Sequence, residues 1–144
     1  MKFFLGAETY APAQNYWMEA RRIIEPQLEK LSSSSYGDGL SSIAIISIIL
    51  PDQFFEHGGY KERRLYKRKS GEADIRLRID FKQFIRAKPE QRLDLYARHI
   101  IECVQTLNGK LSRDFHFDVL LSDLLSVLSD YIFPDEGMAE EAEE

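Results

Sequence analysis

Residues 72–81 read Glu-Ala-Asp-Ile-Arg-Leu-Arg-Ile-Asp-Phe and carry the clearest alternation of apolar and charged residues in the chain. Successive side chains of a β-strand point to opposite faces, so this segment predicts a strand with one buried face and one polar face. Ser70-Gly71 precedes it and has the composition of a tight turn. Together with residues 60–69 before the turn, the segment predicts a β-hairpin over residues 60–81. The alternation assigns one set of residues to the core, Ala73, Ile75, Leu77, Ile79 and Phe81, and another to the polar face, Asp74, Arg76, Arg78 and Asp80.

Outward from the hairpin, apolar runs predict two more strands. Residues 2–8 are apolar and aromatic, and Pro12 follows them closely. Residues 43–50 form a nearly unbroken β-branched run that Pro51 ends. A run of this kind is typical of a central strand that is buried on both faces.

Three segments have the three- and four-residue spacing of apolar residues that predicts an amphipathic helix. The first is 12–31, in which we expect Pro26 to kink or split the helix, because proline removes a hydrogen bond and clashes with the preceding turn. The second begins at Pro89 and is ended by Asn108-Gly109. The third begins near Asp114 or Asp118, either of which suits an N-cap, and stops at Pro134.

The resulting order, β-α-β-β-β-α-α, groups strands together and helices together. This grouping predicts an α+β fold with a largely antiparallel sheet of about four strands and helices on one face. We expect one domain over residues 1–134. Residues 135–144 hold six acids and no base, which predicts a disordered acidic tail. The polar face of the sheet is then left open.

Charge is distributed unevenly along the 144 residues, whose formal net charge is −5. Residues 61–88 hold eleven bases and four acids, whereas the rest of the chain is acidic. Clustered bases with interleaved tyrosines are one way to bind nucleic acid, so a nucleic-acid-binding or regulatory module that uses the hairpin 60–81 is an alternative function. The overall acidity opposes a polyanionic ligand, and bases near a sheet edge also prevent edge-to-edge pairing.

Composition and segment lengths indicate a cytoplasmic protein. The single cysteine forms no intramolecular disulfide. Glu8 interrupts the apolar opening of the chain before it reaches the length of a secretory signal. The longest apolar run, 43–50, is far shorter than the roughly 20 residues that a membrane span needs.

No residue pattern predicts catalysis. His57, His99 and His116 are scattered and lack the spacing of metal ligands. Cys103 falls on the apolar side of its predicted helix, which indicates a packed thiol and not a nucleophile. We therefore expect no catalytic residue, no metal, no cofactor and no enzymatic activity.

The hairpin also resembles a known family. Tyr60-x-Glu62-x-Arg64-x-Tyr66 followed by residues 72–81 is similar to the signature stretch of the immunity protein 44 family, the predicted immunity proteins encoded beside polymorphic toxins in bacteria. A looser likeness extends over most of residues 1–130. The resemblance implies an α+β fold and a non-enzymatic role, in which the protein binds a cognate toxin domain encoded nearby and blocks it.

The polar face of the hairpin is the surface we expect to bind the toxin. Alternating charges supply a fixed mosaic of donors and acceptors, and tyrosine is enriched at interface hot spots. An ordinary solvated sheet face is the alternative for each of these residues. The predicted toxin-binding residues are Tyr60, Glu62, Arg64, Tyr66, Asp74, Arg76 and Arg78.

Overall fold

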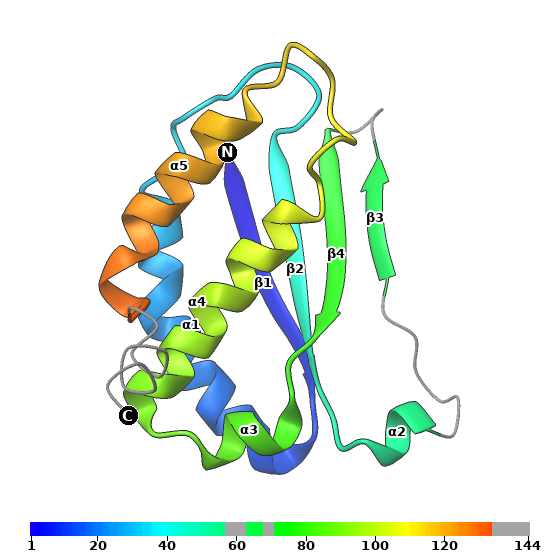
Figure 1. Ribbon diagram of the computed structural model, residues 1–144, viewed down its shortest axis with the longest axis vertical. Coiled ribbons are helices and arrows are strands. Elements are labelled where there is room, and N and C mark those ends of the chain that lie inside the picture. The colour runs from blue at the N-terminus through cyan, green and yellow to red at the C-terminus, as the bar shows by residue number, and fades with distance from the viewer. Residues whose placement is uncertain (57–62, 68–70, 134–144) are drawn as a thin grey trace, which may run out of the picture.

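A computed structural model of the protein describes residues 1–56, 63–67 and 71–133, with Glu56 and 63–67 described by their backbone alone. The fold is α+β (Figure 1). Its elements are, in chain order, β1 (Lys2–Thr9), α1 (Ala11–Glu29), β2 (Ser42–Ile49), α2 (Gln53–Glu56), β3 (Arg63–Lys67), β4 (Glu72–Arg78), α3 (Phe81–Arg86), α4 (Pro89–Gln105) and α5 (Phe117–Leu128), followed by a 3-10 turn over Ser129–Tyr131. The short helices α2 and α3 are absent from the predicted order.

The sheet has the strand order β1-β2-β4-β3. β1, β2 and β4 are parallel to one another, and β3 alone runs antiparallel, against β4. The prediction of a largely antiparallel sheet is therefore wrong. The reason is that α1 returns the chain to the end of the sheet where β1 began, and β4 then inserts between β2 and β3. The predicted hairpin is present as the antiparallel pair β3–β4.

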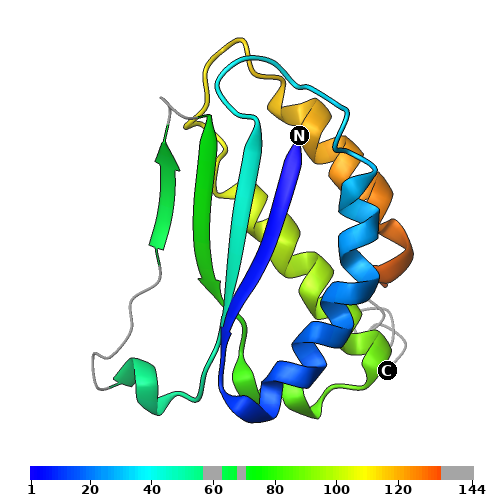
Figure 2. The ribbon, with the colours of Figure 1, turned by 180° about the vertical axis from the view of Figure 1, so that it is seen from behind.

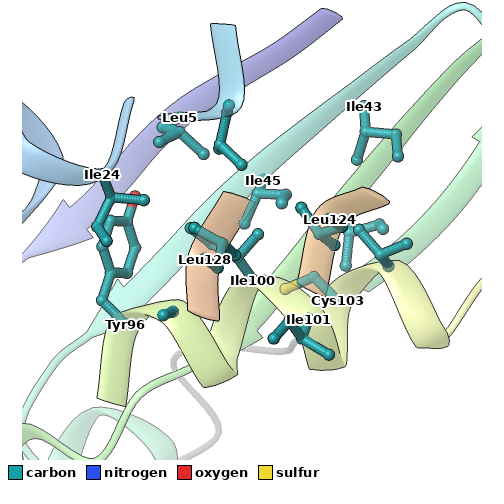
Figure 3. Packing of buried hydrophobic residues seen from close by; sticks show 14 of the residues in the cluster. Leu5, Ile24, Ile43, Ile45, Tyr96, Ile100, Ile101, Cys103, Leu124 and Leu128 are labelled. Atoms are coloured by element: carbon teal, nitrogen blue, oxygen red, sulfur yellow. The ribbon is translucent and has the colours of Figure 1, made fainter. Parts of the chain in front are cut away.

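The helices α1, α4 and α5 gather on one side of this sheet (Figures 1 and 2). β1 packs against α1, β2 and β4 pack against α4, and α5 packs against both α1 and α4. Figure 3 shows side chains from all these layers meeting in one core, among them Ile45 from β2, Ile100 from α4 and Leu124 from α5. These three residues are fully buried. The polar residues of β4 lie on the sheet face that is turned away from these helices.

The alternation along β4 is present as predicted. Ala73, Ile75 and Leu77 are buried, whereas Asp74 and Arg76, like Arg78, are partly exposed. The strand ends at Arg78, however, and not at Phe81. Asp80 terminates the extended run because its carboxylate accepts a hydrogen bond from the Gln83 backbone N–H at 3.0 Å and so caps α3.

The structure confirms some of the predicted helix boundaries and corrects others. α1 continues through Pro26 as a single helix, and α4 begins at Pro89 as predicted. α5 is preceded by His116, so neither Asp114 nor Asp118 is its N-cap, and it ends at Leu128, well before Pro134. The predicted acidic tail, 135–144, lies outside the described residues. None of the described helices is long and apolar enough to cross a lipid bilayer.

Candidate functional site

One face of the sheet carries the charged residues of β4 and is turned away from α1, α4 and α5 (Figure 2). We call it the open face, formed by alternate residues of β1, β2 and β4. The register places Phe4, Ala44 and Asp74 in one row across these strands and Gly6, Ile46 and Arg76 in the next. At the end of this face near α2, Ile48 lies in register with Glu8 and Arg78 and is fully buried. Small and aliphatic residues therefore occupy the centre of the open face. Charged side chains from β1 and β4 flank them.

Arg76 is held by two carboxylates on this face. Its Nη1 donates to Oε1 of Glu8 on β1 at 3.3 Å, and its Nε lies 3.8 Å from Oδ1 of Asp74. Since β2 separates β1 from β4, the Glu8 pair spans the central strand. All three side chains are more than a third exposed, so solvent screens the pairs and their contribution to stability is small. They orient the guanidinium toward Glu8 and Asp74.

Arg78 is fixed in a different way, by residues that follow β2. Its Nη2 donates to Oδ1 of Asp52. Its guanidinium lies 4.2 Å from the centroid of the Phe55 ring, within the range of a cation–π contact. The Nε atom of Arg78 is buried and has no hydrogen-bond partner among the described residues.

A shallow hollow opens on the same face beside Phe4. It measures about 230 Å³ and lies over the first residues of β2 and β4. Phe4 is 57% exposed, which is a high fraction for an aromatic ring in the middle of a strand. The hollow is lined by Phe4, Ser42, Ala44, Glu72, Ala73 and Asp74.

The structure brings together part of the predicted site. Asp74, Arg76 and Arg78 lie on the open face and interact with one another or with neighbours there. Arg64 and Tyr66 lie in β3, where the register pairs them with Ile75 and Ala73, two buried positions of β4. The other two predicted residues, Tyr60 and Glu62, are outside the described residues.

Sequence reasoning did not assign Glu8, Asp52 and Phe55 to the site. Glu8 reaches Arg76 only because β1 and β4 are both neighbours of β2, which no local pattern specifies. Asp52 and Phe55 belong to the turn after β2 and to α2, where the residue types signal a connection and no particular contact. These contacts follow from the strand order.

A cysteine and a histidine lie close together in the buried part of α4. Sγ of Cys103 lies 3.8 Å from Nε2 of His99, and the two side chains are 0% and 5% exposed. Burial lowers the pKa of His99 to about 4, so the imidazole is neutral at physiological pH. A substrate has no access to this thiol, which fits the predicted packing role. The described residues contain no group of three or more potential metal-ligating side chains.

A family model described as immunity protein 44 matches residues 1–130. No curated protein and no solved structure matches the chain.

Proposed function

Because the chain belongs to the immunity protein 44 family, we propose that it binds a toxin domain encoded nearby, neutralises it by direct contact, and uses the open face of the sheet as its docking surface. The observation that carries this proposal is the apolar surface that Phe4, Ala44 and Ile46 leave exposed on the open face among the described residues. Faces of parallel strands are nearly always covered by other elements, whereas Ala44 and Ile46 on this face remain partly exposed. A bound toxin domain would bury them.

The charged groups of the open face suit selective protein recognition. Arg76 and Arg78 are each held by a carboxylate, and Arg78 also by an aromatic ring. Side chains that are already ordered lose less conformational entropy on binding, so more of the interaction energy contributes to affinity. A fixed pattern of alternating charge also discriminates between partners, since a mismatched toxin would place like charges together.

The same ion pairs favour a protein partner over nucleic acid. Binding to a phosphate backbone depends on basic side chains that neutralise phosphates and release counterions. The two arginines of β4 already face Glu8, Asp74 and Asp52. A phosphate would therefore meet carboxylates beside each of these guanidinium groups.

Binding to the neighbouring toxin tests the proposal. The probe is the toxin domain encoded next to this chain, inactivated by mutation and titrated calorimetrically against the purified protein. We expect tight binding by the wild type, and at least about tenfold weaker binding, or about 1.4 kcal/mol, for Arg76→Ala and for Arg78→Ala.

Arg21→Ala is the matched control, because Arg21 forms an equally exposed ion pair with Glu25, on α1 and away from the open face. We expect this variant to bind as the wild type does. If the wild type neither binds the toxin nor protects cells that express the active form, the proposed function is wrong. Equal affinities for the two open-face variants and Arg21→Ala would show that the docking surface lies elsewhere on the protein.

A further inference from the structure

The parallel strands β1, β2 and β4 all end at the same edge of the sheet, and the three segments that follow them meet there (Figure 1). Tyr10 follows β1, Phe54 lies in α2 after β2, and Phe81 begins α3 after β4. The ring of Tyr10 is 6.1 Å from that of Phe54 and 6.0 Å from that of Phe81, the second contact being edge-to-face. We call these three residues the aromatic patch.

Two of the three rings of the aromatic patch are exposed, whereas Phe81 is partly buried and packs against the core. Tyr10 is 44% exposed and Phe54 is 38% exposed. Single exposed aromatic residues are common on protein surfaces, but contiguous ones mark interaction sites. The ring contacts place the three side chains beside one another. Aromatic residues are enriched at protein–protein interfaces.

The aromatic patch is continuous with the open face through α2. Phe54 and Phe55 are adjacent in this helix, and Phe55 lies against the guanidinium of Arg78. Arg78 is 31% exposed, and Asp52 accepts from one of its Nη groups. An arginine has donors only, so a partner group that forms a hydrogen bond with its exposed part is an acceptor.

We propose that the aromatic patch is the hot spot of the docking surface and receives an apolar side chain of the toxin domain that is flanked by a hydrogen-bond acceptor for Arg78. This inference rests on the proposed function and adds to it the chemistry of the toxin surface. The apolar side chain covers Tyr10 and Phe54, and the acceptor meets Arg78 at the border with the open face. The tilted contact of Tyr10 with Phe54 and its edge-to-face contact with Phe81 leave part of the Tyr10 and Phe54 rings exposed to the partner.

The test measures affinity for the inactivated toxin domain encoded next to this chain. Phe54→Ala and Tyr10→Ala are expected to weaken binding by 10- to 100-fold, whereas Tyr10→Phe retains the ring and binds within about threefold of the wild type. Met18→Ala and Val119→Ala are the controls, since these side chains are 46% and 51% exposed on α1 and α5, outside the patch. We expect both controls to bind as the wild type does.

Phe54→Lys separates a folding defect from a lost contact. Phe54 is exposed on a short helix, so a charged residue there leaves the core intact, and the far-UV circular dichroism and thermal midpoint should match those of the wild type. Unchanged toxin affinity of folded Phe54→Ala and Phe54→Lys would overturn the hot-spot inference and leave the open face as the docking surface. Absence of toxin binding by the wild type would instead refute the proposed function itself.

Discussion

Acidification should destabilise this protein through His99. The imidazole is buried in α4 and stacks on the Tyr96 ring at 6.4 Å. Burial lowers its pKa to about 4 in the native state, whereas the unfolded chain has the ordinary value of about 6.5. Below pH 6.5 the imidazole is therefore protonated in the unfolded chain but stays neutral in the native protein. The free energy of unfolding decreases as the pH falls from 6.5 toward 4.

The size of the effect follows from the two pKa values. Each pH unit within this window costs about 1.4 kcal/mol, so lowering the pH from 8 to 5 should remove about 2 kcal/mol of stability through His99 alone. Urea denaturation at both pH values measures the total loss. His99→Gln supplies the reference, because it keeps a polar side chain at the position and does not titrate.

The wild type should lose about 2 kcal/mol more than His99→Gln between pH 8 and pH 5. The difference between the two proteins removes the contribution of carboxylates that titrate in the same range. Equal losses would show that the native imidazole accepts its proton as readily as the unfolded one. The reasoning from burial would then be refuted.

Two further predictions concern stability, and chemical denaturation measures both. Gly37→Ala should destabilise the protein by at least about 3 kcal/mol, because the residue has φ of +114° and a Cβ there would lie 2.1 Å from the Asp114 carbonyl oxygen. Gly109→Ala, with φ of +82° and open space around the Cβ position, should cost only about 1 kcal/mol, and a similar loss in both variants would contradict the steric argument. Ser47→Ala should leave stability unchanged or raise it by about 1 kcal/mol, because the buried Oγ has no hydrogen-bond partner among the described residues; a clear loss would reveal one.

Local patterns of the sequence predicted most individual elements but not the direction of the strands. The alternation in residues 72–78 and the turn before it specified the hairpin, because strand pairing across a short turn is antiparallel. The position of β1 depends on the path of the chain through α1, over a connection of more than thirty residues. One signal for parallel pairing was present in residues 43–50, since unbroken apolar runs are typical of parallel strands. This signal predicted a central strand, and β2 is one. The prediction did not conclude from it that the strands beside β2 run parallel to it.

The residues of the candidate site, like the elements of the fold, were predictable from the sequence only in part. Period-two alternation was sufficient to put Asp74, Arg76 and Arg78 on one polar face of the sheet. Their partners Glu8 and Asp52 were not predictable, because both contacts depend on which strands lie side by side and where β2 ends. Arg64 and Tyr66 illustrate a further limit. Their register against β4 places them opposite buried residues, and register across a turn is not fixed by the pattern of one strand alone.

The parallel arrangement has a functional consequence that an antiparallel sheet would lack. An antiparallel sheet commonly keeps one face in water, so an open polar face would need no partner. Parallel strands are normally covered on both sides, yet among the described residues Ala44 and Ile46 are partly exposed between ion-paired side chains, whereas Ile48 in the next row is buried. Their common direction also gathers Tyr10, Phe54 and Phe81 at one edge of that face. The strand direction that the sequence patterns did not predict is thus what places apolar and ion-paired residues together on the open face and brings the aromatic patch to its end.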